Sequence, residues 1–477
     1  MLNNSAHHHE VLSGRYDLVS LLENDTKHYP FLLETTAQTR ISKSTKSAES
    51  NTPTFDILFA FPQQQLVKHS NNTVTLDGHA CASSIFLDEL DLAWKKDAEN
   101  SDQIPELPFS GGWFVYLGYE LTSEVEPTIC MNKTNQDLPD AFATRIPAAI
   151  IYDHTQNQTH IVVEDTFKNL SADIKSSLEK AGQHTSQKSD KPKDLLINNI
   201  KEDEPGTYLD SVGKVLDYIR EGDVFQVNLS RQWEAELKDD ITDVDVYRKL
   251  RTANPAPFSA MVKFNQTAIV SSSPERLFCT DARTIETRPI AGTRPRGQTP
   301  LNDEKLQSEL ISNHKERAEH IMLIDLERND LGRICQPGTI HVDEFMLLES
   351  YAHVHHIVSN VSGELQQNIT PGQIIKAVFP GGTITGCPKV RCMEIIAELE
   401  QAPRGAYTGS LGFLNHNGNM DMNILIRTLT IHNKQVTFRA GAGIVTDSIA
   451  ENELDETRAK AKGIIMALCE QEREDLK

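Results

Sequence analysis

The chain has 477 residues and a formal net charge of −21 at pH 7, a balance that argues against a nucleic-acid-binding protein because phosphate backbones are bound by clustered Lys and Arg. No window approaches the roughly 18 to 20 apolar residues of a membrane-spanning helix, and the start, MLNNSAHHHEVLSG, lacks the basic region and apolar core of a signal peptide. Seven cysteines without a C-x-x-C pair indicate a reducing, cytoplasmic location. From the charge and the missing apolar window, we expect neither a nucleic-acid nor a membrane partner.

The first part of the chain holds short apolar runs between polar stretches. The histidine run His7–His9 is interpreted as a solvated, tag-like terminus, with metal binding as the alternative. Further on, the stretches FDILFAFP at 55–62 and GGWFVYLGYEL at 111–121 predict strands.

A polar segment divides the chain. Residues 166–204 are rich in Lys, Ser, Asp and Glu, and the stretch GQHTSQKSDKPKD within them has no apolar period. Such composition predicts a surface linker. We therefore expect an amino-terminal region at 1–165 and a second region at 205–470, which has a denser alternation of helix and strand signals.

The second region opens with a helix and a strand. In YLDSVGKVLDYIREG, at 208–222, apolar residues fall on one helical face and Gly222 follows as a stop signal. The next stretch, VFQVNLSRQW, alternates an apolar and a polar face: Phe225, Val227 and Leu229 against Gln226, Asn228 and Ser230. Near its end the region shows an Asn417-Gly418 turn between alternating runs, which predicts an antiparallel meander.

Two later helices each carry a pair of glutamates. In HKERAEHIMLIDLERND, Glu316 and Glu319 share one helical face with Leu323. The last helix, ENELDETRAKAKGIIMAL, repeats the spacing with Glu453, Glu456 and Lys460, and its apolar stripe comprises Ala461, Ile464 and Leu468. Four such carboxylates would suit Mg²⁺, a hard cation that prefers oxygen ligands. The alternative is that both pairs are ordinary solvated helix residues, since spacing does not show that the two helices meet.

The order of motifs resembles a known family. In sequence order they are SPERL, PIAGTRPRG, HKERAEHIMLIDLERNDLGR, YAHVHHIVS, FPGGTITGCPKVRCMEII, RGAYTGSLGF, NILIRT, AGAGIVTDS and ENELDETRAKA. Together they resemble the chorismate-utilising enzymes, in particular anthranilate synthase large subunits and aminodeoxychorismate synthase component I. The resemblance is close over about 205–470 and looser in the amino-terminal region. It implies an α/β (α+β) fold of two large antiparallel sheets packed as a sandwich, with helices outside and the active site between the sheets.

The resemblance also implies roles for individual residues. Glu275 in SPERL matches the general acid that protonates the departing C4 hydroxyl of chorismate, and would otherwise be an ordinary strand-end glutamate. His356 matches the family's active-site histidine, whereas His353 and His355 have no such match and are expected to be packing or surface groups. We do not expect zinc at this histidine cluster, because alternate strand residues provide only part of a tetrahedral set.

Metal and substrate ligands follow from the same resemblance. Glu319 and Glu456 match direct Mg²⁺ ligands, and Glu316 and Glu453 match their water-mediated or hydrogen-bonding companions. Six further positions match substrate-binding groups: Thr383, Tyr407, Arg427, Gly441, Gly443 and Lys460. An arginine, a phenol and a lysine suit the carboxylates of chorismate, and glycine lets the backbone approach a ligand closely. The stretch GGTITG lacks the arrangement of a phosphate-binding loop.

Two positions bear on the reaction. Gln226 stands where water-using members carry a lysine base, so the resemblance implies an ammonia-using enzyme. Ala291 stands where a subset of aminodeoxychorismate synthases has a nucleophilic lysine, and the alanine taken alone resembles the anthranilate type. The stretches NPAPFSAM at 254–261 and FPGGTITGCPK resemble aminodeoxychorismate synthases instead. We expect amination at C4 to give 4-amino-4-deoxychorismate, and anthranilate formation is the alternative.

Regulation and partners are the remaining expectations. Leu33, Glu34 and Thr35 in PFLLETT take the places of a tryptophan-binding segment in anthranilate synthases, and a purely structural role is the alternative. The seven cysteines include none in a glycine-rich nucleophile elbow, so we expect a separate glutaminase subunit to supply ammonia. A non-catalytic relative that only binds chorismate is a further alternative, although every matched position except the variable lysine is filled.

Overall fold

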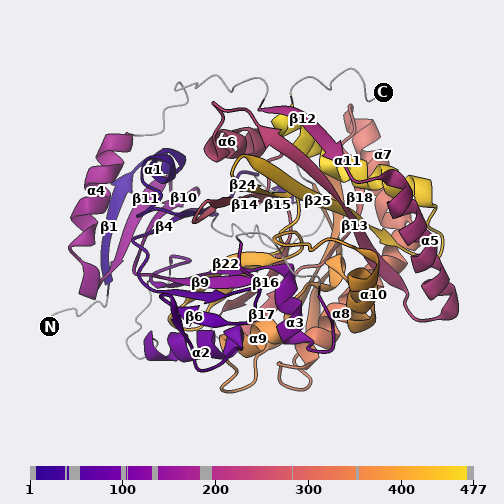
Figure 1. The fold of residues 1–477 in the computed structure, drawn as a ribbon, viewed down its shortest axis with the longest axis horizontal. Helices are drawn as coiled ribbons and strands as arrows, with labels where there is room; N and C mark the ends of the chain where they lie inside the picture. Colours follow the sequence, from indigo (N-terminus) through magenta and orange to yellow (C-terminus); the bar gives the residue numbers. More distant parts are fainter. Residues whose placement is uncertain are drawn as a thin grey trace.

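The computed structural model describes residues 7–37, 40–41, 54–97, 104, 106–131, 138–182, 196–281, 283–350 and 354–469. Two large antiparallel sheets lie one above the other, with helices on their outer faces (Figure 1). This architecture confirms the predicted α/β sandwich.

The first sheet contains 12 strands in the described residues. In spatial order they are β1 (His7–Ser13), β11 (Gln158–Glu164), β10 (Ala148–Asp153), β4 (Phe55–Ala60), β2 (Phe31–Glu34), β14 (Phe258–Phe264), β15 (Thr267–Ser273), β24 (Thr428–His432), β25 (Gln435–Ile444), β13 (Gln226–Leu237) and β12 (Ile197–Glu202). The short strand β21 (Gly386–Cys387) pairs with the start of β13, on the edge opposite β25.

The second sheet contains 13 described strands. Their order is β3 (Arg40–Ile41), β19 (His341–Ser350), β20 (Val354–Glu364), β17 (Thr284–Thr287), β16 (Arg276–Asp281), β23 (Met420–Asn423), β22 (Ser410–Asn415), β8 (Gly112–Leu117), β9 (Ala141–Ile146), β5 (Gln65–Lys68), β6 (Val74–Leu76) and β7 (His79–Ala80). Strand β18 (Ile290–Pro295) also pairs with β20, along the residues 354–358 that precede those paired with β17. The predicted turn at Asn417-Gly418 joins β22 to β23, and Gly418 adopts a φ of 89° there.

Helices cover both outer faces. They are α1 (Leu18–Asn24), α2 (Phe86–Asp97), α3 (Thr122–Val125), α4 (Leu170–Ala181), α5 (Pro205–Glu221), α6 (Asp243–Ala253), α7 (Pro300–Ser312), α8 (His314–Gly332), α9 (Pro371–Val378), α10 (Lys389–Leu399) and α11 (Ala450–Leu468). Among the described residues there are also three 3₁₀ turns: η2 (Tyr119–Leu121), η3 (Asp165–Phe167) and η4 (Gly382–Ile384). In the described part of the chain, no helix is both long enough and apolar enough to cross a membrane.

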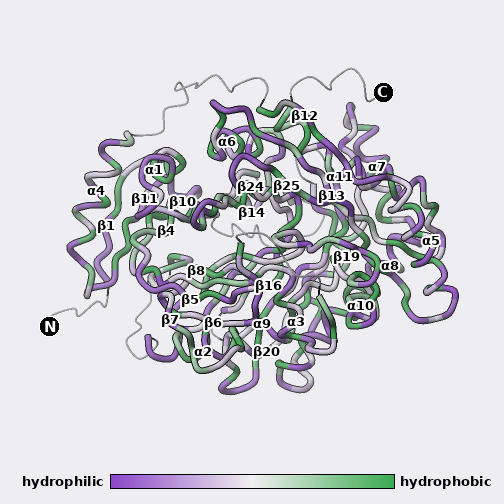
Figure 2. Tube along the Cα trace, in the orientation of Figure 1, coloured by the Kyte–Doolittle hydropathy of each residue, from purple (hydrophilic) through white to green (hydrophobic). Residues whose placement is uncertain are grey.

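The sheets pack through a layer of aromatic side chains. Phe31 and Phe59 of the first sheet contact Phe114, Phe142 and Phe413 of the second. The rings of Phe31 and Phe114 stack with centroids 4.1 Å apart, and such pairs contribute about 0.5–1.5 kcal/mol beyond their buried area. Figure 2 shows hydrophobic stretches along the central strands and hydrophilic stretches on outer helices such as α4 and α5. The aromatic core between the sheets therefore fixes the position of one sheet relative to the other.

Both sheets draw strands from either side of the expected linker. β2 from the amino-terminal region pairs with β14, and β8 pairs with β22. The regions 1–165 and 205–470 thus share their sheets. Part of 166–204 is regular: α4 buries Ile174 and Leu178, and β12 extends the first sheet. Most of the stretch GQHTSQKSDKPKD lies outside the described residues.

Two local interpretations of the sequence were wrong. The run His7–His9 begins β1, where His7 is buried and the ring of His9 stacks on His160, so it is not a tag-like terminus. Phe225 lies outside β13 with 67% of its surface exposed, although alternation placed it on the apolar face. The helix before it ends as predicted, with Gly222 in the left-handed conformation.

Candidate active site

A cavity of about 730 Å³ lies between the sheets and the helices α8 and α11. Its walls include every residue that we assigned to catalysis, substrate or metal: Gln226, Glu275, Glu316, Glu319, His356, Thr383, Tyr407, Arg427, Gly441, Gly443, Glu453, Glu456 and Lys460. Ala291 lines it too, from β18. The structure therefore brings these dispersed positions into one site, and their chemical roles stay predictions.

Glu275 lies between β15 and β16 and is only 6% exposed. Its backbone carbonyl accepts from the Ile424 amide at 3.0 Å, which anchors the residue to the neighbouring segment. The Thr383 hydroxyl donates to its Oε1 at 2.8 Å. Burial raises the pKa of Glu275 to about 7, against the opposing effects of Thr383, Lys460 and Arg427. A carboxyl group with this pKa can hold a proton near neutral pH, as a general acid must.

His356 faces the cavity from β20. Its Nδ1 lies 3.2 Å from the Gly292 carbonyl oxygen and 3.0 Å from the Thr293 hydroxyl. Because a carbonyl oxygen can only accept, the contact with Gly292 places the proton of the neutral ring on Nδ1. Burial lowers the pKa of His356 to about 4, so the ring is neutral at pH 7. A neutral imidazole with an unprotonated Nε2 can accept a hydrogen bond.

The neighbouring histidine has a different environment. His355 is fully buried, and its ring bridges Ser350 at 2.7 Å and Asp303 at 2.8 Å. It does not line the cavity, which agrees with the expected packing role. His353 lies outside the described residues.

The four glutamates come from two helices. Glu316 and Glu319 project from the first turns of α8, and Glu453 and Glu456 project from those of α11. Burial raises the pKa of Glu319, and the nearby carboxylates of Glu316, Glu456 and Glu453 raise it further. The tertiary structure thus brings the two carboxylate pairs to the same cavity, and their role as metal ligands stays a prediction.

Cations of the protein contact these carboxylates. Arg294 donates to Glu316 at 3.1 Å, Lys460 lies 2.8 Å from Glu456, and Lys315 lies 3.8 Å from Glu319. As the described side chains lie, no three His, Cys, Asp or Glu residues are close enough together to hold a metal ion. The donor set nevertheless fits Mg²⁺, since it consists of carboxylate oxygens whose mutual repulsion a divalent cation would relieve.

The expected substrate-binding groups line the same cavity, and one of them, Lys460, also contacts Glu456. Lys460 donates to the Gly441 carbonyl at 2.9 Å, and Arg427 reaches Asn254 at 3.4 Å. Burial lowers the pKa of Arg427 and raises that of Tyr407 to about 12. The phenol is therefore protonated and the guanidinium, whose ordinary pKa is far above neutrality, stays charged. These groups can donate hydrogen bonds to carboxylates.

β25 approaches polar side chains of the cavity closely at Gly441 and Gly443. A Cβ at Gly441 would lie 2.7 Å from Oδ1 of Asn228 and 2.8 Å from the Tyr407 hydroxyl oxygen. A Cβ at Gly443 would lie 2.6 Å from Nε2 of Gln226. The Gln226 side chain can move away from a Cβ at Gly443, whereas a Cβ at Gly441 would also lie 2.8 Å from the backbone carbonyl oxygen of Leu229. Glycine is therefore required at Gly441.

Two buried amides lie on this side of the cavity. Gln226 and Asn228 are 9% and 8% exposed, and the Oε1 and Oδ1 atoms have no hydrogen-bond partner among the described residues. A buried acceptor without a partner costs free energy unless a ligand or water satisfies it. Gln226 was expected at the site, whereas Asn228 was missed, although it shares the polar face of the same predicted strand.

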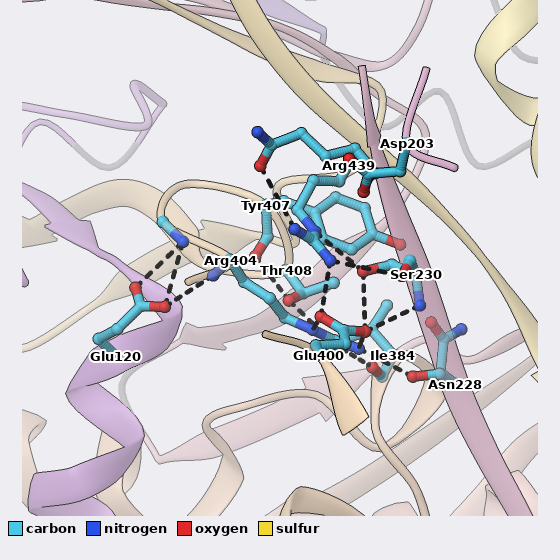
Figure 3. Close-up of polar contacts among 12 residues, drawn as sticks. Glu120, Asp203, Asn228, Ser230, Ile384, Glu400, Arg404, Tyr407, Thr408 and Arg439 are labelled. Atoms are coloured by element: carbon cyan, nitrogen blue, oxygen red, sulfur yellow. Dashed lines mark hydrogen bonds and ion pairs between the residues drawn. The ribbon is translucent and has the colours of Figure 1, made fainter. Parts of the chain in front are cut away.

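Other cavity residues were also missed. Asn254, Arg294 and Arg439 line the walls. Asn254 and Arg294 stand in the quoted stretches NPAPFSAM and PIAGTRPRG but were given no role, and Arg439 stands in no quoted motif. The period of a strand could have found Arg439, because it is two residues from Gly441 and therefore points to the same face of β25. Arg439 joins a buried network with Glu400, Arg404 and Ser230 (Figure 3).

The expected tryptophan segment lies elsewhere. Leu33, Glu34 and Thr35 do not line the cavity. Glu34 is buried and accepts from the Tyr247 hydroxyl at 2.5 Å, with Arg15 and Arg251 each at 3.3 Å. The Thr35 hydroxyl contacts the backbone carbonyls of Phe55 and Pro257. These polar groups are engaged within the protein, in agreement with the structural alternative, and whether tryptophan binds stays a prediction.

Comparison with known proteins places the chain in a family. The chorismate binding enzyme family matches residues 39–466. An anthranilate synthase component I-like protein of Synechocystis is 42% identical over 78% of this chain and 76% of its own. Aminodeoxychorismate synthase component 1 of Bacillus subtilis is 41% identical over 79% of this chain and 81% of its own.

A solved structure agrees with these relatives. Anthranilate synthase component I from Streptococcus pneumoniae superposes with a TM-score of 0.77 at 32% identity, and the match covers 89% of this chain and 94% of that one. The relatives include enzymes named for two different products, so they leave the product of this chain open. The match over most of its length shows that this chain belongs to the chorismate binding enzyme family.

Proposed function

We propose that this protein is the chorismate-aminating component of an aminodeoxychorismate synthase, which converts chorismate and ammonia to 4-amino-4-deoxychorismate and water. The observation that carries the proposal is the pairing of a buried acid with buried amides in one cavity. Glu275 has a pKa of about 7, and the amide oxygens of Gln226 and Asn228 lack partners. The acid suits departure of a hydroxyl group, and the amides suit a nucleophile that donates hydrogen bonds.

Glu275 is the proton donor of the proposed reaction. Its proton passes to the C4 hydroxyl of chorismate, which leaves as water. Thr383, hydrogen-bonded to Oε1, then stabilises the carboxylate that forms. Lys460 and Arg427, whose charges also lower the pKa of Glu275, oppose the effect of burial. The acid is thus strong enough to donate and weak enough to remain protonated near neutral pH.

Ammonia is the proposed nucleophile. An amide at Gln226 cannot deprotonate water, whereas ammonia is nucleophilic without a base. Ala291 presents only a methyl group to the cavity, so a covalent adduct with a lysine at this position is not available. Ammonia therefore adds at C2 as the C4 hydroxyl leaves, and a second ammonia adds at C4 as the C2 amine departs with a proton. One hydroxyl group is exchanged for one amino group overall.

Magnesium would be held by the carboxylates of α8 and α11. Bound there, Mg²⁺ would neutralise the ring carboxylate of chorismate and orient the ring. Glu319 and Glu456 are the proposed direct ligands, with Glu316 and Glu453 beside them. The fit rests on their common place on one cavity wall and on the raised pKa values of Glu319 and Glu453, which have burial as the main cause and neighbouring carboxylates as a further one.

Amination at C4 is supported by two stretches on the cavity wall. Residues 254–257 of NPAPFSAM line the cavity, as do Thr383 and Ile384 of the GGTITG stretch. Both stretches resemble aminodeoxychorismate synthases. Ala291 favours the second candidate function, an anthranilate synthase that places the amine at C2 and eliminates pyruvate.

Product identity decides between the two reactions. The purified chain is incubated with chorismate, Mg²⁺ and excess ammonium salt at mildly alkaline pH, and the product is identified by mass spectrometry and fluorescence. An amino product that retains the enolpyruvyl group supports the proposal, and anthranilate with pyruvate contradicts it. A covalent chorismate adduct on any lysine of the intact protein would refute direct addition of ammonia at C2.

A separate glutaminase is the proposed source of ammonia. The expected dependence is that glutamine alone does not support the reaction of this chain, whereas ammonium does. Addition of a compatible glutaminase subunit should restore turnover with glutamine. Turnover by the chain alone with glutamine would contradict a separate subunit.

A further inference from the structure

A buried charged cluster lies next to Tyr407 (Figure 3). Its centre is the Glu400 carboxylate, which is 6% exposed. Arg404 donates to it from Nε at 2.9 Å and from Nη2 at 2.7 Å, and Arg439 donates from Nη2 at 3.0 Å. The backbone amide and hydroxyl of Ser230 add contacts of 2.8 and 2.9 Å. Two guanidinium groups therefore share one carboxylate.

Glu400 carries a full negative charge. Burial acts to raise its pKa, but the charges of Arg404 and Arg439 hold it below the ordinary value. The other two carboxylates in Figure 3 bond to backbone amides: Glu120 to those of Arg404 and Gly405, and exposed Asp203 to that of Gln232. The carboxylate at the centre of the cluster thus faces two positive charges.

The two arginines lie differently with respect to the cavity. The Arg404 guanidinium stacks between the rings of Tyr119 and Tyr407, with centroid distances of 4.8 and 5.6 Å, and does not line the cavity. Arg439 lines the cavity from β25, on the same strand face as Gly441. Arg404 makes the bidentate pair with Glu400, so Arg439 contributes the charge in excess.

Excess charge in a buried position has a cost. A buried charge without a full counter-charge destabilises the fold, and low-dielectric walls make its field strong inside an adjacent cavity. An anion in the cavity would complete the balance. Arg439, two residues from Gly441, lies at the wall where the proposed substrate carboxylate binds.

We propose that Arg439 is a specificity residue for dianionic substrates. The positive charge of its guanidinium attracts a carboxylate of chorismate to the Tyr407 side of the cavity. The inference rests on the proposed function, because it takes chorismate as the substrate. Arg439 acts by its charge at the wall, while Tyr407 and Arg427 supply the donors. The role explains why two arginines surround one glutamate.

The variant Arg439→Gln tests this role. Arg404 and Ser230 still satisfy Glu400 in the variant, and the new amide can bond to Ser230 or Gln232, so the fold should persist. The expected result is a KM for chorismate raised about tenfold with kcat within about twofold of wild type, because a charge that binds substrate and transition state alike acts on KM. The Tm of the free variant should equal or exceed that of wild type, since an excess buried charge has been removed.

Arg231→Gln is the matched control. Arg231 is a buried arginine, 1% exposed, on the adjacent strand β13, and it pairs with Glu202 at 3.3 Å and packs on the Trp233 ring. It does not line the cavity. Its replacement should lower the Tm and leave the KM for chorismate unchanged, which is the opposite pattern.

The outcomes separate the two proposals. A wild-type KM in Arg439→Gln, or a lower Tm with a proportional loss of kcat, would overturn the specificity role and show a structural one. Chorismate should also raise the Tm of wild type more than that of Arg439→Gln at equal concentration. If wild type neither binds nor converts chorismate, the proposed function fails, and the Arg439 role is overturned with it.

Discussion

The Thr383 hydroxyl donates a hydrogen bond of 2.8 Å to Oε1 of Glu275, although the two residues are 108 positions apart in the sequence. Burial raises the pKa of Glu275 to about 7, and this hydrogen bond is the largest of the effects that lower it. Because the proposed general acid acts in its protonated form, kcat/KM for chorismate should fall as pH rises above about 7. The measurement is a pH profile at a constant concentration of free ammonia.

Thr383→Val should move this limb to higher pH. Removing the donor destabilises the carboxylate, so the pKa of Glu275 rises further and the decline begins later. Thr385→Val is the matched control, because the Thr385 hydroxyl donates to the Gly381 carbonyl instead of Glu275. An unchanged limb in Thr383→Val would mean that another group controls it.

Glu275→Gln should lower kcat by about 10²–10⁴, the usual contribution of a positioned acid.

Glu319→Gln should weaken Mg²⁺ binding. The change removes one carboxylate from the wall shared by α8 and α11, so we expect the dissociation constant to rise at least about tenfold, which corresponds to about 1.4 kcal/mol. Isothermal titration calorimetry of the free protein gives the constant without reliance on turnover. Glu309→Gln, in the adjacent helix α7 and outside the cavity lining, is the control. Equal affinities in both variants would place the metal elsewhere.

Gly441→Ala should impair substrate binding. The added Cβ would collide with Asn228 and the Tyr407 hydroxyl, at 2.7 and 2.8 Å, and would push both away from the cavity. We expect the KM for chorismate to rise about tenfold or more. Gly213→Ala is the control, because nothing lies within 4 Å of a Cβ there and alanine in a helix interior stabilises by about 0.5–1 kcal/mol. A wild-type KM in Gly441→Ala would show that the backbone here does not approach the substrate.

His355→Leu should lower the free energy of unfolding. The fully buried ring links Ser350 to Asp303, and its loss leaves the buried Ser350 hydroxyl without this partner at a cost of about 1–3 kcal/mol, while Asp303 keeps its bonds from Arg296 and Gly297. Urea unfolding measures the change. His8→Leu, which removes a half-exposed contact of 2.9 Å with Glu10, should cost less than about 1 kcal/mol. Similar losses in both variants would contradict the bridging role of His355.

Local patterns in the sequence predicted the elements of the site but not all of their surroundings. The spacing of Glu316 and Glu319 placed them on one face of α8, and Gly222 ended α5 as expected, because helix geometry depends on residues within a few positions. The apolar positions Ile464 and Leu468 of α11 are buried as predicted. Periodicity placed Phe225 on the apolar face of the strand, but its side chain is exposed. Exposure at a strand end depends on which other segments pack over it.

The sequence by itself therefore determined the helices that carry the glutamate pairs, the end of α5 at Gly222, the turn at Asn417-Gly418 and, through its motifs, the family and the candidate residues. Only the tertiary structure decided that α8 and α11 line the same cavity, that β2 pairs with β14, and that Arg439 shares the Glu400 carboxylate with Arg404. The physical reason is the distance along the chain over which each feature is set. A helical face follows from hydrogen bonds four residues apart, whereas sheet order and buried ion pairs follow from contacts between segments that no local period relates.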